Sequence, residues 1–269
     1  MSALPARASA FLDRLGRATL GAVSEIGFAA VLLAESLMWA VVGRRRRQPV
    51  RLGLIFAEAM EVGVKAVPIV TIMALTIGLM LAIQSIYALK TFGAESRVVF
   101  GVALSVVREF APLITGILVA GRSGSAFAAR LGTMRINQEI DALTVMGINP
   151  VRFLVAPALF GTLLMVPALT VWADLVALFG AGLYITLELG MDMAAYADQV
   201  IEVLAVNDIA HGLGKSALFA VLIALIGVVN GALVSGGAEG VGRMTTRSVV
   251  HAITAIVITD MVFAFVLTR

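Results

Sequence analysis

Several residue types that build common sites are missing or scarce in this chain. Cysteine is absent, which excludes disulfides, thiol catalysis and cysteine-ligated metals. The only two histidines, His211 and His251, stand far apart and form no ligand motif, so we expect no metal site. The P-loop pattern G-x-x-x-x-G-K-[ST] does not occur. We therefore expect that this chain itself binds no cofactor.

Charged residues are also scarce, at 14% of the 269 residues, whereas 60% are hydrophobic. Soluble chains average about 25% charged and about 45–50% apolar residues. The mean hydropathy of +1.01 excludes an ordinary soluble domain and a disordered protein, because so few charges could not keep the surface in water. The chain is therefore expected to fold within a membrane, as one domain at this length.

Two long intervals without a charged residue are the strongest sign of membrane-crossing helices. They run from Lys65 to Lys90 and from Lys215 to Glu239. Each exceeds the ~20 residues that cross about 30 Å of hydrocarbon. Three further apolar stretches contain one or more charges or a histidine. Five spans are therefore predicted, of which the third is one long tilted helix containing two prolines; they lie at about 64–89, 101–121, 153–187, 213–235 and 247–267.

The N-terminal segment, residues 1–48, differs from the permease-like remainder, residues 49–269. Residues 20–43 are mostly apolar but contain Glu25 and Glu35. They could span the membrane, but we favour an amphipathic helix that lies in the interface. The predicted fold is thus an all-α integral membrane protein. It has about five transmembrane helices, an N-terminal interfacial helix and a short cytoplasmic helix described below.

The orientation follows from the distribution of Lys and Arg in the loops. Arginines precede the first span, fill the segment between the second and third spans, and separate the fourth from the fifth; they are Arg44 to Arg47, Arg51, Arg122, Arg130, Arg135, Arg152, Arg243 and Arg247. The loop after the third span is acidic instead. The basic loops are therefore predicted to be cytoplasmic. We interpret Arg44 to Arg47 as this topology signal, with binding of anionic lipid as the alternative.

The long segment between the second and third spans contains an amphipathic pattern. Ile136, Ile140, Leu143 and Met146 recur at helical spacing, and Gly147 ends the pattern. A short cytoplasmic helix is therefore predicted over about 134–146. It could lie passively at the interface, or its acidic side could meet a protein.

Several motifs in this region resemble those of the MlaE family. They are REFAPLITG at 108–116, VAGRSGSA at 119–126, LGTMR at 131–135 and IDAL at 140–143, followed by Met146-Gly147. Further matches are Gly240 to Gly242, Thr245, Thr246, Val249, Val250 and Asp260. The resemblance runs from about residue 50 to the end. Members of this family are the permease subunits of ABC-type lipid transporters that work with MCE-domain proteins.

The resemblance implies a non-catalytic permease of the bacterial inner membrane that transports lipid, most simply phospholipid, and maintains outer-membrane asymmetry. It implies a homodimer, separate cytoplasmic P-loop ATPases that hold ATP and Mg²⁺, and a periplasmic MCE-domain protein. No nucleic-acid partner is expected. The helix at 134–146 would be the coupling helix, with its ATPase contacts made by Arg135, Gln138, Glu139, Asp141, Leu143 and Met146.

Four charges lie within the predicted spans: Arg108, Glu109, Asp174 and Asp260. Each costs roughly 2.5–3.5 kcal/mol at the bilayer centre, so none is expected to face lipid. They either pair inside the bundle or border the path of a lipid headgroup. Alternatively, an ion-coupled secondary transporter would use the three carboxylates, although no repeat is visible. Small residues at Gly116, Gly121 and Gly124 are expected to let helices pack closely.

Overall fold

The computed structural model describes the backbone of residues 3–43 and 48–267, so Arg44 to Arg47 lie outside the described residues. Within these ranges every regular element is helical, which confirms the predicted all-α membrane fold. Six helical segments there are long and apolar enough to cross a membrane, one more than predicted: Thr19–Val42, Leu52–Lys90, Glu95–Ile136, Val151–Leu189, Val206–Ala232 and Gly237–Val266.

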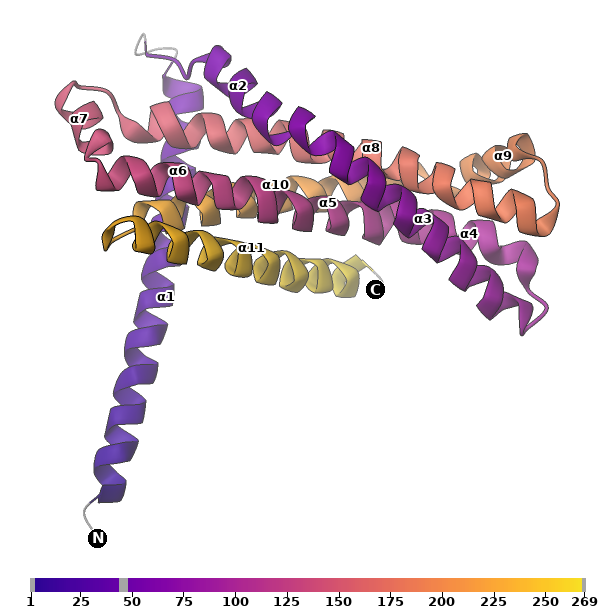
Figure 1. Ribbon diagram of the computed structural model, residues 1–269, viewed down its shortest axis with the longest axis horizontal. Helices are drawn as coiled ribbons and strands as arrows, with labels where there is room; N and C mark the ends of the chain where they lie inside the picture. The colour runs from indigo at the N-terminus through magenta and orange to yellow at the C-terminus, as the bar shows by residue number, and fades with distance from the viewer. Residues whose placement is uncertain (1–2, 44–47, 268–269) are drawn as a thin grey trace.

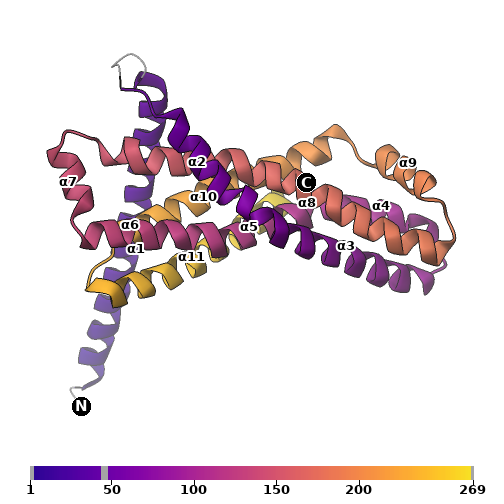
Figure 2. The ribbon, with the colours of Figure 1, turned by 45° about the horizontal axis from the view of Figure 1, so that its top comes forward.

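The additional segment belongs to α1 (Ala3–Val42), which takes a direction of its own. Five segments run along the long axis of the molecule, whereas α1 crosses them (Figures 1 and 2). The interfacial position of residues 20–43 stays a prediction, since this segment is also apolar enough to span. The described part of α1 is anchored by polar contacts, since Arg247 Nη2 donates to both oxygens of Glu25 at 2.6 and 2.8 Å. Asn149 Nδ2 also donates to Glu35 Oε1 at 2.8 Å.

The first two bundle segments are each built from several helices. The first joins α2 (Leu52–Val62) and α3 (Val67–Lys90) through one 3₁₀ turn, η1 (Val64–Ala66). The second contains α4, α5 and α6, separated by two turns of π-helix, η3 and η4; the bounds are η2 (Glu95–Arg97), α4 (Val98–Ser105), η3 (Val106–Phe110), α5 (Ala111–Val119), η4 (Ala120–Gly124) and α6 (Ser125–Ile136). Both segments extend beyond the predicted spans.

The remaining helices complete the bundle. A π-turn, η5 (Val151–Val155), leads into α8 (Ala156–Leu189), a single helix that contains Pro167 in its interior. The last three helices are α9 (Met193–Val203), α10 (Val206–Ala232) and α11 (Gly237–Leu267). α10 ends at Ala232, before the predicted end of the fourth span at 235. α11 begins at Gly237, before the predicted start of the fifth span at 247. The reason is that Gly236 and Gly237, with φ of 86° and 72°, form the turn in the left-handed region that glycine tolerates.

Among the described residues the helices α3 and α8 make the most extensive helix–helix contact, and they run in the same direction. Glu58 and Ala59 lie against Gly161 at one end, and Lys90 pairs with Glu188 at the other. Between these points, a Cβ added at Gly78 would lie 2.0 Å from the carbonyl oxygen of Ala177. Small residues therefore allow backbone to touch backbone, which is how helices associate in lipid. We call this contact the α3–α8 seam.

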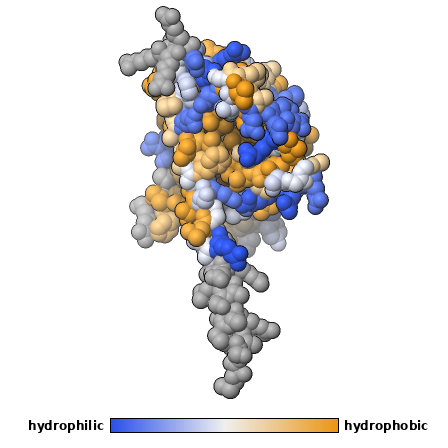
Figure 3. Space-filling view, turned by 90° about the vertical axis from the view of Figure 1, so that its left-hand side faces the viewer, coloured by the Kyte–Doolittle hydropathy of each residue, from blue (hydrophilic) through white to orange (hydrophobic). Residues whose placement is uncertain are grey.

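The two ends of the bundle differ in charge. The basic end carries α7 (Glu139–Val145), the starts of α8 and α11, and the residues Arg135, Arg152, Arg243 and Arg247. The acidic end carries α9 with Glu188, Asp192, Asp198 and Glu202. Figure 3 looks onto the basic end, where hydrophilic and hydrophobic side chains are interspersed.

Candidate functional site

A lysine that is fully buried among the membrane helices holds an unusual group of charges. Lys215 on α10 is 1% exposed, and its Nζ lies 2.5 Å from Glu109 Oε2 and 3.0 Å from Asp260 Oδ1. The contact with Asp260 is ionic only, because this oxygen accepts no hydrogen bond within the described residues. A buried ammonium costs several kcal/mol unless it is paired. Two carboxylates, from η3 and α11, supply that pairing and join three helical segments.

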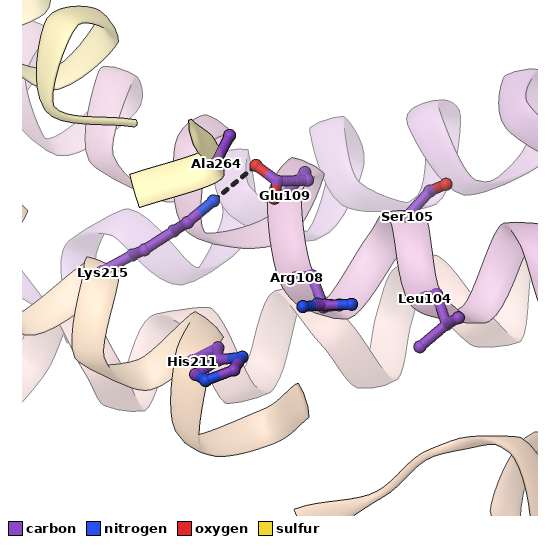
Figure 4. A pocket seen from close by; sticks show the side chains of 7 residues that line it. All are labelled: Leu104, Ser105, Arg108, Glu109, His211, Lys215 and Ala264. Atoms are coloured by element: carbon purple, nitrogen blue, oxygen red, sulfur yellow. Dashed lines mark hydrogen bonds and ion pairs between the residues drawn. The ribbon is translucent and has the colours of Figure 1, made fainter. Parts of the chain in front are cut away.

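An open pocket of about 200 Å³ adjoins this charged cluster (Figure 4). Figure 4 shows Lys215 extending toward Glu109, whereas Arg108 and His211 lie on the other side of the pocket. Arg108 Nε lies 3.5 Å from Asp208 Oδ1, in the first turn of α10. Leu104 and Ala264 add an apolar lining to this pocket. Charged groups beside apolar walls suit an amphiphile that carries a polar head.

The local backbone explains how Arg108 and Glu109 reach this position. Both lie in the π-turn η3, which is followed by Pro112 in the first turn of α5. Proline has no N–H, so the carbonyl of Arg108 loses its ordinary α-helical donor four residues on. Such a gap favours the wider π-turn, a feature found frequently at functional sites. The turn thus presents two adjacent charged side chains beside α10.

The four charges predicted within the spans do not form one network. Glu109 and Asp260 are brought together through Lys215, and Arg108 lies next to them in the pocket. Asp174 on α8 makes no ion pair among the described residues, and its buried Oδ1 has no hydrogen-bond partner there. The geometry therefore separates Asp174 from the other three residues.

Sequence reasoning missed Lys215 as a site residue. It treated this lysine as the polar boundary of an apolar run, because no other charge follows until Glu239. The structure starts α10 at Val206, so Lys215 lies more than two turns inside the helix. The acidic Asp208 in the first turn of α10 was the available signal that the helix begins earlier.

The expected coupling helix is shorter than predicted. A continuous helix over 134–146 is contradicted, because α6 ends at Ile136 and α7 covers only Glu139–Val145. Between them Gln138 adopts φ 60°, in the left-handed region, and Asn137 Nδ2 donates to Glu139 Oε1 at 3.0 Å. These polar residues form a corner that turns the chain at the basic end of the bundle (Figure 1).

The side chains of this corner are mostly exposed. Arg135, Gln138, Glu139 and Asp141 all face outward, and Leu143 is buried. The expected apolar face is incomplete, because Met146 is 64% exposed and its neighbour Val145 is 88% exposed. α7 therefore presents both charged and apolar side chains beyond the bundle.

The three glycines expected to pack against neighbouring helices behave differently. A Cβ at Gly116 would lie 3.0 Å from Phe219 Cδ2, and one at Gly124 would lie 3.3 Å from Ile223 Cγ2. Both therefore lie closely against α10. A Cβ at Gly121 would meet nothing within 4 Å, so this glycine does not pack against a described helix.

The comparisons with known proteins agree with this architecture. A family model described as Permease MlaE matches residues 55–266, which include the charged cluster and α7. A probable ABC transporter permease of Rickettsia conorii is 32% identical over 243 residues, covering 88% of this chain and 94% of that protein. The Haemophilus influenzae protein named intermembrane phospholipid transport system permease protein MlaE is 28% identical over 261 residues, covering 96% and 97%.

A plant protein is similar over a smaller part of its length. The chloroplastic protein TRIGALACTOSYLDIACYLGLYCEROL 1 of Arabidopsis thaliana is 33% identical over 202 residues, which cover 75% of this chain and 58% of that protein. The family match and the bacterial relatives each extend over most of the chain. This chain is therefore a multi-pass membrane protein that belongs to the MlaE permease family.

Proposed function

We propose that this chain is the permease subunit of an ABC-type phospholipid transport complex in a bacterial inner membrane. Two copies form the membrane core, and a periplasmic MCE-domain protein exchanges lipid with it. The complex maintains the lipid asymmetry of the outer membrane. The observation that carries this proposal is the family match over 55–266, supported by the printed phospholipid-transport name of the Haemophilus relative.

The energy comes from a separate cytoplasmic ATPase that binds ATP and Mg²⁺. The sequence has no P-loop, so the permease needs an element through which force can enter. α7 suits this role because it projects at the basic end and is tied to two bundle segments. Its exposed Glu139, Asp141, Val145 and Met146 offer both charged and apolar contacts to a partner.

The lipid headgroup passes the pocket beside the charged cluster. Arg108 and Lys215 offer positive charge to a phosphate, and Glu109 and Asp260 balance that charge when no lipid is present. Acyl chains need an apolar path. α11 has a face of exposed apolar side chains that a second copy or lipid can cover: Val250, Val257, Ile258, Met261, Val262, Phe265 and Val266.

Purification of the native complex followed by reconstitution tests the proposal. We expect a P-loop ATPase and an MCE-domain protein to co-purify with the chain. In proteoliposomes that hold the complex, labelled phospholipid should move to the MCE partner only with ATP. The matched control is the same complex with the P-loop lysine of the ATPase replaced. Transport by the permease alone, driven by a proton gradient, would contradict the proposal and favour an ion-coupled transporter.

A further inference from the structure

Two adjoining pockets lie at the basic end, where the end of α1, the start of α2 and the start of α8 meet (Figures 1 and 2). Pro49 and Arg51 line both of them. The first pocket has a volume of about 410 Å³ and the second about 770 Å³. Because they share two lining residues, they lie side by side at this end of the bundle. We call the two together the elbow groove.

The first part of the elbow groove is positively charged. Arg51 and Arg152 line it, and neither makes an ion pair with any carboxylate among the described residues. The Arg152 guanidinium is held in place, since Nη1 donates to Gln48 Oε1 at 3.0 Å and the group lies 5.5 Å from the centroid of a Trp39 ring. One oriented arginine, Arg152, together with Arg51, neither paired with a carboxylate of the described residues, suits a phosphate oxyanion.

The backbone adds to this preference for an anion. α2 begins directly after Arg51, which makes no side-chain cap, and its first turn contains no acidic residue. Leu54 and Ile55 donate their backbone N–H groups to the Arg51 carbonyl, so the first two N–H groups of α2 are the ones without an intrahelical acceptor and with partial positive charge. The helix start and the two arginines therefore favour the same ligand chemistry at one place.

The second part of the elbow groove is apolar. Apart from Arg51, its lining includes Val50, Ile55, Phe160 and Leu164. Leu164 is 55% exposed and lies on α8, so this part opens along the side of the bundle. A soluble phosphate makes no apolar contacts with these side chains, whereas the acyl chain of a lipid can pack against them. The charged part lies at the end of the bundle and the apolar part lies along its side. A lipid in a leaflet has the same arrangement, with its headgroup at the membrane surface and its acyl chains below.

We propose that the elbow groove binds an anionic phospholipid of the leaflet at the basic end, with its phosphate at Arg51 and Arg152 and an acyl chain against Phe160 and Leu164. This site is separate from the pocket beside Lys215 and does not take part in the transport path. The bound lipid joins α1 to the starts of α2 and α8. It gives the permease a preference for anionic lipid around it.

The two tryptophans of the chain provide the test, because only Trp39 lies at the groove. Trp172, on the middle of α8 and 43% exposed, reports on general lipid contact. The full-length W172F and W39F variants are placed in nanodiscs, and quenching by brominated phosphatidylglycerol and brominated phosphatidylcholine is compared. Each arginine near an anionic headgroup contributes about fivefold to binding. Trp39 should therefore prefer phosphatidylglycerol by about 25-fold, and Trp172 should show no preference.

Substitutions in the W172F background identify the residues responsible. Arg51→Gln with Arg152→Gln should abolish the preference at Trp39, whereas the double change to Lys should keep most of it. Arg243→Gln removes one charge elsewhere at the basic end and should have no effect. Two measurements establish that each double variant is folded. One is circular dichroism, and the other is the quenching of Trp172 when the same double change is made in the W39F background. A wild-type Trp39 without preference, or a preference that survives the change to Gln, overturns the proposal. If millimolar inorganic phosphate shifts Trp39 emission and removes the preference, the ligand is a free phosphate and the lipid assignment is wrong.

Discussion

Replacement of Lys215 by Met tests whether the side chain stabilises the protein through its ion pairs or only through its packing. Methionine preserves the length and most of the volume of the side chain, but it leaves Glu109 and Asp260 without their shared cation. Removal of one partner from a buried ion pair costs about 3–5 kcal/mol. Folded domains are stable by only about 5–15 kcal/mol, so this loss is a large fraction of the total.

The structure also predicts an order among the variants. Glu109→Gln should cost only about 1–2 kcal/mol, because Lys215 keeps Asp260 and the Glu109 side chain is already 41% exposed. Unfolding by sodium dodecyl sulfate in mixed micelles, followed by circular dichroism, measures these differences. Lys65→Met is the matched control, since Lys65 pairs with Glu61 on the surface and its side chain is 63% exposed.

Two results would refute this reasoning. One is a Lys215→Met protein as stable as the Lys65→Met protein. The other is a Glu109→Gln protein less stable than Lys215→Met. The first result would mean that the buried charges contribute little to the native state. The second would mean that Glu109, and not the cation shared by the two carboxylates, dominates the stability of the cluster.

Three further predictions concern other parts of the molecule. Glu139→Lys or Asp141→Lys should abolish stimulation of the partner ATPase in reconstituted complexes at unchanged thermal stability, because both side chains are exposed on α7; stimulation that survives both changes contradicts the docking role. Gly78→Leu should destabilise the protein by about 3 kcal/mol or more in the same detergent titration, since even a Cβ meets Ala177, whereas Gly121→Ala should be neutral. Tyr196 Oη donates to the Leu178 carbonyl, and burial raises the pKa of Tyr196 to about 12 from 10.0. Absorbance at a wavelength specific for tyrosinate should therefore show a late-titrating phenol, and Tyr196→Phe should remove it. Because the folded pKa is raised, the stabilising contribution of neutral Tyr196 is fully present below pH 10.0 and is lost as the pH rises toward 12.

The sequence predicts the fold class because hydrophobicity along the chain is a local property. Runs such as Lys65 to Lys90 must become helices in lipid, since every backbone group has to be paired internally. The direction of a helix is not local. α1 is apolar enough to span, yet it lies across the bundle, where Glu25 and Glu35 contact residues far along the chain.

The candidate site could be predicted only in part for the same reason. Glu109 and Asp260 stand out as charges in apolar runs, but their common partner lies on a third helix and resembles a span boundary in the sequence. The corner at Gln138 was also hidden, because the apolar spacing continues through it and the left-handed backbone of a glutamine leaves no pattern. Likewise, a glycine in a helix does not reveal whether it faces a neighbour, as at Gly116, or open space, as at Gly121.

The α3–α8 seam restricts how this permease can change shape. Where backbone touches backbone, no long side chain is available to switch rotamer and stabilise a second arrangement. A tilt between the two helices would force Gly78 and Ala177 apart or together with nothing to fill the gap or absorb the clash. We therefore expect α3 and α8 to move together as one rigid body. We expect motion around them instead, at α11, where only 11% of the residues in the most apolar stretch are buried, and at the π-turns of the second segment.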